Sequence, residues 1–142
     1  MANAVYNVLK TALVTGDINL ATDTLKVILV TATYVPNIDT HQFYPAVTNE
    51  IPTGGGYTLG GVVLAGVAVL TDLPNDRAAL DANDVTWVAS TITAARGAII
   101  YKDTGVPATS KLITYIDFVT DKSSSGGDFT IAWDATGILR LQ

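Results

Sequence analysis

Few side chains in this sequence could do chemistry at neutral pH. His41 is the only histidine among 142 residues, and the chain has no cysteine. An imidazole is the one side chain that acts as a general base near neutrality without a shift of its pKa. A serine for it to activate would sit in a Gly-x-Ser-x-Gly turn, a motif that the sequence does not contain. We therefore interpret His41 as a loop or interface residue, predict no catalytic residue and expect that the protein is not an enzyme.

Three polar stretches have the composition of ligand sites without their spacing. Residues 72–76 and 81–84 each gather Asp and Asn, whose oxygens suit Ca²⁺, but neither has the EF-hand spacing or its final glutamate. The glycine-rich stretch Gly54–Gly61 lacks both the glycine order and the Gly-Lys-Ser/Thr ending of phosphate-binding loops. We expect turns at the two acidic clusters and a hinge at the glycines, with no metal and no cofactor.

The composition is that of a single, weakly charged domain, residues 1–142. Hydrophobic residues make up 49% of the chain and charged residues 15%, against about 25% charged in a typical domain. Because so few charges are available to solvate the surface, we predict that part of it is covered in a homo-oligomer, a dimer or trimer. The net charge is −5 and the eight basic residues are scattered, so no nucleic-acid partner is expected.

No segment of the sequence is typical of export or of a membrane anchor. The N-terminus lacks the basic start of a signal peptide, and polar residues interrupt its apolar positions. The most apolar window, Gly61–Leu70, is far too short to span a bilayer. We therefore expect a soluble protein that is made in the cytoplasm and has no membrane partner.

The first half of the chain contains two regular patterns. Apolar residues from Val5 to Leu13 recur at helical spacing, and Gly16 follows as a suitable C-cap. An N-terminal strand or extended arm is the alternative for this segment, because its β-branched and aromatic residues suit either. The run Thr24–Thr31 is β-branched and nearly continuously apolar, which predicts a central strand that is buried on both faces.

A long segment, residues 32–56, breaks this pattern. It is rich in turn residues and still carries large aromatic side chains, which is typical of a functional loop or an arm. Aromatic rings on such segments often anchor partners, but they could equally fold back as a lid on the core. The N-terminal segment is a second contact candidate, because termini often order on binding. The predicted interface candidates are Tyr34, Phe43, Tyr44, Val5 and Tyr6.

The second half reads as short strands separated by turns. We expect a bend at Gly66, a bulge around Arg96–Gly97 and clean alternation from Phe129 to Trp133, with both tryptophans in the core. About eight or nine short strands favour an all-β, mainly antiparallel fold, a jelly-roll-like β-sandwich. The expected strands are 61–70, 77–81, 85–89, 90–103, 111–120, 129–133 and 138–141.

Most of the chain resembles a family of small virion proteins of tailed bacteriophages. The matching stretches are MANAVYNVLKTALVTGDINLATDTLKVILVTATYVPNIDTH at the N-terminus, then NDVTW, STITAARGAIIYKDTG, LITYIDF and SSSGGDFTIAWDATGIL. Members of this family are similar to capsid cement or decoration proteins, which are often jelly-roll homo-oligomers. The resemblance implies a virion structural protein that clamps neighbouring major capsid proteins of an HK97-type shell.

The implied location is the capsid surface of the virion, after synthesis in the host cytoplasm. The matching motifs are structural and identify no active site, and a tail or fibre structural module would share them. A third possibility is a carbohydrate-binding module used in host adsorption, with Trp87 or Trp133 as the sugar-facing ring.

Overall fold

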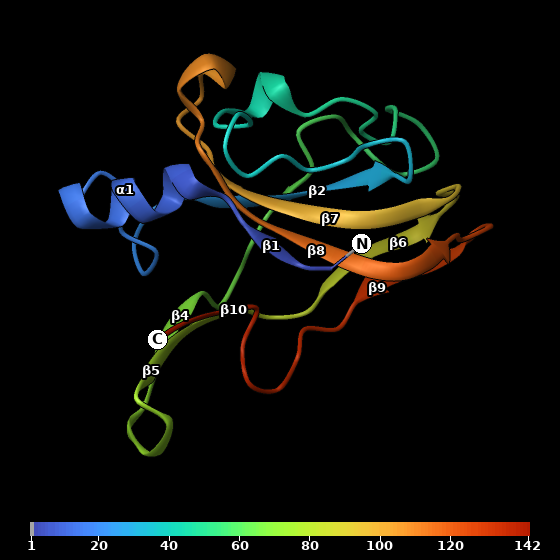
Figure 1. The fold of residues 1–142 in the computed structure, drawn as a ribbon. Helices are drawn as coiled ribbons and strands as arrows, with labels where there is room; N and C mark the ends of the chain where they lie inside the picture. The colour runs from blue at the N-terminus through green and yellow to red at the C-terminus, as the bar shows by residue number, and fades with distance from the viewer. Residues whose placement is uncertain (1) are drawn as a thin grey trace.

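The computed structural model describes residues 2–142 and is mainly β, with 42% strand and one α-helix, α1 (Asn7–Thr15). The prediction of an all-β, sandwich-like fold is confirmed. Figure 1 shows one large curved sheet, with the helix at one end and smaller sheets below it. The strands are β1 (Ala4–Val5), β2 (Leu25–Thr31), β3 (Val62–Val63), β4 (Ala68–Asp72), β5 (Arg77–Asp81), β6 (Val85–Ser90), β7 (Ala95–Lys102), β8 (Leu112–Lys122), β9 (Gly127–Ile131) and β10 (Leu139–Leu141).

The large sheet has the strand order β1-β8-β7-β2-β3, and all its neighbours are antiparallel. The β-branched strand β2 pairs along its whole length with β7, and its inner residues are buried on both faces, as predicted. The register of β7 shifts between Ala95 and Gly97, which places a bulge at the predicted position.

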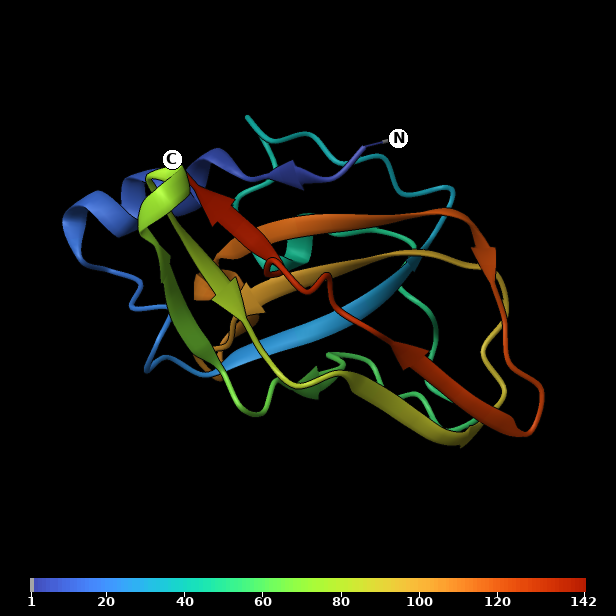
Figure 2. The same ribbon diagram turned by 90° about the horizontal axis from the view of Figure 1, so that it is seen from below.

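Two smaller sheets, β10-β5-β4 and β6-β9, lie across one face of the large sheet. Figure 2 shows this face from below, with the two small sheets side by side. The predicted strand Gly61–Leu70 is in fact two strands, because Gly66 turns the chain with a φ of 63°. A Cβ on this glycine would lie 2.3 Å from the Asn83 side chain, so the turn needs glycine for its space as well as its φ. The turn sends β3 to the large sheet and β4 to a small one.

The hydrophobic core has two parts, one on each face of the large sheet. Successive residues of β2 alternate between them: Val27 and Leu29 belong to the core under the small sheets, and Ile28 and Val30 to the core on the other face. The segment 32–60 covers this second face (Figure 1). The molecule is therefore built as three layers, and the long loop is one of them.

The N-terminal segment contains both of the predicted alternatives in succession. Residues Ala4–Val5 form the edge strand β1 against β8, and α1 begins two residues later. Gly16 ends the helix in the left-handed conformation, and its N–H donates to the carbonyls of Ala12 and Leu13, as the C-cap prediction requires. No helix within residues 2–142 is long and apolar enough to cross a membrane.

Candidate interaction surfaces

The segment 32–60 is held to the body of the molecule by backbone hydrogen bonds in both of its halves. In the first half, Tyr44 N–H donates to the Ser110 carbonyl and Leu112 N–H of β8 donates to the Gln42 carbonyl, each at 2.9 Å. In the second half, Ile51 N–H donates to the Leu29 carbonyl of β2 at 2.9 Å. Because of these bonds the segment packs as a fixed part of the fold, although it has little regular secondary structure.

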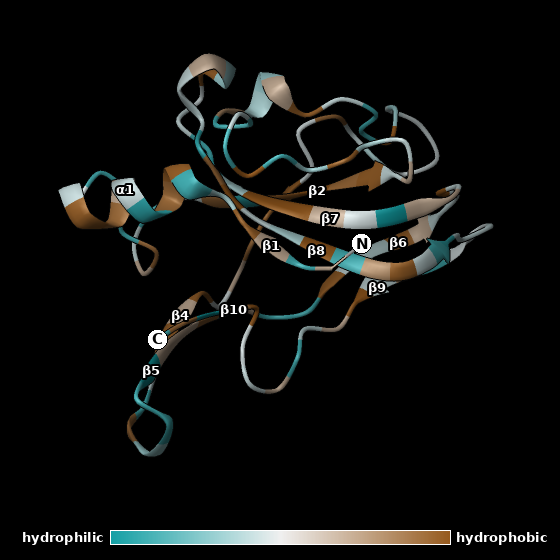
Figure 3. Cartoon of the chain, viewed as in Figure 1, coloured by the Kyte–Doolittle hydropathy of each residue, from teal (hydrophilic) through white to brown (hydrophobic). Residues whose placement is uncertain are grey.

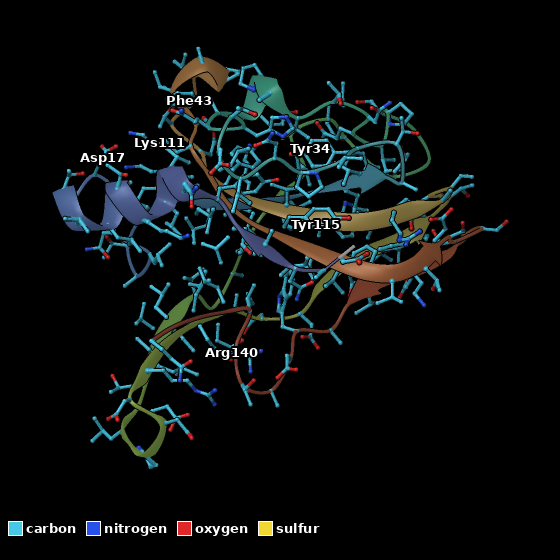
Figure 4. The ribbon with its side chains drawn as sticks, viewed as in Figure 1. Asp17, Tyr34, Phe43, Lys111, Tyr115 and Arg140 are labelled. Carbon is cyan, nitrogen blue, oxygen red and sulfur yellow. The ribbon has the colours of Figure 1, made fainter. Side chains whose placement is uncertain are left out.

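Two of the five predicted interface residues are buried under this segment. Tyr6 is fully buried and Tyr34 is 2% exposed. Their hydroxyls are 2.8 Å apart, and the Tyr34 hydroxyl lies 2.9 Å from Nδ1 of His41. Since Asn37 N–H also donates to this nitrogen, Nδ1 is an acceptor, which gives a hydrogen-bond direction from Tyr6 to Tyr34 to His41. Figure 4 shows Tyr34 between the loop and the large sheet, above Tyr115.

This burial corrects the expectation for these two rings. Tyr6 and Tyr34 fill the core on the loop side of the sheet, so in this structure neither ring is an exposed anchor. The lid interpretation, which the sequence left open, describes them. His41 is explained by the same contacts, as a loop residue that accepts hydrogen bonds.

A single carboxylate, that of Glu50, fastens the second half of the loop. Its oxygens accept hydrogen bonds from the hydroxyls of Tyr44 and Tyr57 and from the N–H of Gly60, the last two at 2.7 and 2.8 Å. The Tyr44 ring also stacks on Tyr101, with ring centroids 5.0 Å apart. Tyr44 is therefore a half-buried structural residue, and only part of its ring reaches the surface.

The other two candidates, Phe43 and Val5, are half-buried at the surface. Phe43 lies opposite Lys111 in an isolated bridge, and the Lys111 ammonium is 6.0 Å from the centre of its ring. Lys111 also forms an ion pair with Asp17, beyond the end of α1. Figure 4 shows Phe43, Lys111 and Asp17 on one side of the molecule. Of the predicted aromatic anchors, Phe43 and Tyr44 are the two half-buried rings, and of these Tyr44 is held by Glu50 and Tyr101.

Burial raises the pKa of every tyrosine in the chain. Desolvation is the largest cause for all six residues, and it favours the neutral phenol. For Tyr57 the nearby Glu50 carboxylate raises the pKa further. These hydroxyls therefore act as neutral hydrogen-bonding groups in the core.

The acidic cluster at residues 72–76 forms a capped turn, as predicted. In the 72–76 turn, Asp72 accepts hydrogen bonds from Asn75 and from Arg77, and Asp76 adopts a left-handed φ of 52°. The Asn75 amide, followed by Arg77, lowers the pKa of the Asp72 carboxyl. Within residues 2–142, no group of three or more His, Cys, Asp or Glu side chains could hold a metal ion.

The two tryptophans differ in environment. Trp87 is 4% exposed and contacts Tyr57 and Phe129 in the core, as predicted. Trp133 lies beyond the end of β9 and is only half-buried, so it packs against the core from its edge and does not lie inside it as predicted. Its indole N–H donates to the Asn83 carbonyl at 2.9 Å, and its ring lines a surface cavity of about 320 Å³ beside Phe118.

The hairpin β4–β5, which projects from the body of the molecule (Figure 1), carries a group of exposed apolar side chains. Three of its large apolar side chains, Val69, Leu70 and Leu73, are 48%, 42% and 77% exposed. Figure 3 shows hydrophobic residues along this hairpin as well as in the central strands. This surface was not among the predicted contact candidates, although the absence of any charged residue from residues 51–71 is a signal for it.

Comparisons with protein-family models, curated proteins and solved structures find no match to this chain. The geometry of the described residues is therefore the basis for a function. Three surfaces among those residues could contact a partner. They are the Phe43 region (Phe43 and Lys111), the groove that is the surface cavity beside Trp133, and the projecting hairpin β4–β5.

Proposed function

We propose that this chain is a structural protein of a phage virion, most specifically a capsid cement protein. In this role it self-associates and clamps neighbouring major capsid proteins of an HK97-type shell from the outside. The observation that carries the proposal is the exposed apolar hairpin β4–β5 on a scaffold with few charges. Such apolar surface is costly to leave in water and marks contact with other protein chains. The resemblance to small virion proteins supplies the virion context.

The architecture suits a clamp. The loop layer, the large sheet and the small sheets enclose two buried cores. The residues at the surface are therefore held by a rigid, well-packed fold. A rigid scaffold loses little conformational entropy on binding, which favours affinity. The Phe43 region and the half-buried Val5 lie on this scaffold and are our candidates for the capsid contact.

The clamp would act by avidity. An oligomer that touches several capsid subunits at once needs only modest affinity at each contact, because the later contacts form at high effective concentration. Separating two capsid subunits would then require breaking the bridge as well as their own interface. We therefore expect the protein to raise the temperature at which filled particles open.

Reconstitution tests this function. Phage particles that lack the protein are mixed with purified wild-type chain, with Phe43→Ala or with the control Val119→Ala, which removes an exposed apolar side chain at the far end of β8. We expect wild type and Val119→Ala to bind the heads and to raise their opening temperature, and Phe43→Ala to bind with lower occupancy.

Other binding patterns would replace the proposal. Attachment to tails alone would favour a tail or fibre module. Binding to host-cell glycans, lost in Trp133→Ala, would favour a carbohydrate-binding module that uses the groove beside this ring. Unchanged head stability at full occupancy would also contradict the cement role.

A further inference from the structure

The strand β4 is an unprotected sheet edge. Its sheet has the order β10-β5-β4, so within residues 2–142 β4 hydrogen-bonds to β5 on one side only. An edge strand presents unpaired backbone N–H and C=O groups, and natural proteins protect them with charges, proline, bulges or a covering segment. From Ala68 to Thr71, β4 carries no charge and no proline, and its register with β5 runs without a shift.

Both faces of β4 are also exposed. Val69, Leu70 and Thr71, the three consecutive residues at its centre, are all exposed although their side chains point to alternate faces. Its partner β5 pairs with β10 on the other side and contributes the buried Leu80 to the core, so β4 is the open strand of this small sheet. Within residues 2–142, β4 therefore lacks a strand partner on its outer edge, and its three central side chains are exposed to water.

We propose that the outer edge of β4 pairs antiparallel with β4 of a second copy of this chain, about a two-fold axis at Leu70. The two three-stranded sheets then join as one six-stranded sheet. This contact is part of the self-association in the proposed function and rests on it.

Charge selects the second copy and the antiparallel direction. With Leu70 opposite Leu70, Val69 faces Thr71 and Ala68 faces Asp72, so no like charges meet. A parallel pairing in register would set the two Asp72 carboxylates opposite each other, which is destabilising. Each Asp72 already has Arg77 of its own hairpin as an ionic partner at 2.8 Å. The antiparallel register thus brings no like charges together, whereas the parallel register does.

The contact is small. Two five-residue strands bury less than the roughly 800 Å² per partner of a standard stable interface, so we expect a weak dimer in free solution. The same contact would strengthen between copies that a shell holds side by side.

Two opposite charges at one position test the pairing. The full chain is made as Leu70→Lys, as Leu70→Glu and as the control Val14→Lys, which changes an 88% exposed residue of α1. Sedimentation equilibrium over a wide concentration series measures the dimer dissociation constant, and thermal melting checks that each variant folds. We expect each Leu70 variant alone to dimerise about tenfold more weakly or worse, because like charges then face each other. An equimolar mixture should regain dimers, and Val14→Lys should match wild type.

Three results would overturn the proposal: a wild type that stays monomeric throughout, folded Leu70 variants that dimerise like wild type, or a mixture that regains no dimer. The failure of the proposed function is a separate result. A dimer with the expected pattern from a protein that does not bind heads would remove the cement role and leave the β4 contact standing.

Discussion

Replacing Glu50 with alanine should loosen the segment 32–60 from the large sheet. Glu50 is the only glutamate in the sequence, and its carboxylate accepts hydrogen bonds from Tyr44, Tyr57 and Gly60. Alanine leaves all three donors without this acceptor. The perturbation therefore acts first on the loop layer, at residues that also contact β2 and β7 through Tyr57 and Tyr44.

The expected cost follows from the burial of the three donors. Hydrogen bonds to a charged group contribute about 1.5–3 kcal/mol each when they cannot be replaced by water. That applies to Tyr57, which is 1% exposed, whereas Tyr44 and Gly60 are half-buried and can turn partly to water. We expect a total loss of about 2–4 kcal/mol in the free energy of unfolding. A typical domain has only about 5–15 kcal/mol.

Urea denaturation measures this loss as a lower midpoint with an unchanged slope. Limited proteolysis should show faster cleavage within 32–60. Glu50→Gln, which keeps one acceptor oxygen, should cost less than Glu50→Ala. The control Asp39→Ala removes an exposed carboxylate that accepts from Asn7, and it should change stability by under about 0.5 kcal/mol. A similarly small effect of Glu50→Ala would refute the idea that this carboxylate fastens the loop.

Three further predictions concern the cores. Burial raises the folded pKa of each tyrosine above the unfolded value of about 10. The contribution of these phenols to the free energy of unfolding is therefore complete below about pH 10 and is lost as the pH rises above it. Tyrosinate absorbance should thus rise together with unfolding, and Tyr6→Phe should move that midpoint to higher pH; ionisation well before unfolding would contradict this. Trp87→Ala should lower the free energy of unfolding in urea by about 3–5 kcal/mol, because it empties a buried site. Trp87→Phe should cost much less, because the phenylalanine also removes an indole N–H that lacks a partner among the described residues. Gly97→Ala should cost about 1–3 kcal/mol, because its Cβ would lie 2.6 Å from the Tyr115 ring; a neutral result there would mean that the ring can move.

The elements that sequence patterns predicted well are those decided locally. The strand at β2, the C-cap at Gly16 and the bulge at Arg96–Gly97 follow from nearby residue types. The pairing of β5 with β10, some sixty residues apart, has no local signal. The split at Gly66 was predicted as a bend and is a change of sheet, because the alternative depends on Asn83 across the turn.

The candidate site was harder to predict for a related reason. Aromatic residues on a polar loop serve equally as anchors or as a lid, and distant partners decide between the two. For Tyr34 the deciding partner is Tyr6, and for Tyr44 it is Glu50. The lone glutamate in an aromatic segment was a usable signal for the second case. Phe43 is half-buried beside Lys111, and its role as an anchor stays a prediction.

A density map of the intact virion by electron cryomicroscopy tests the central claim most directly. At a resolution that separates strands, the three-layered fold can be located without a label. The cement proposal predicts copies on the outer surface of the head, each bridging neighbouring major capsid proteins. Copies found only in the tail, or none in the mature particle, would contradict it.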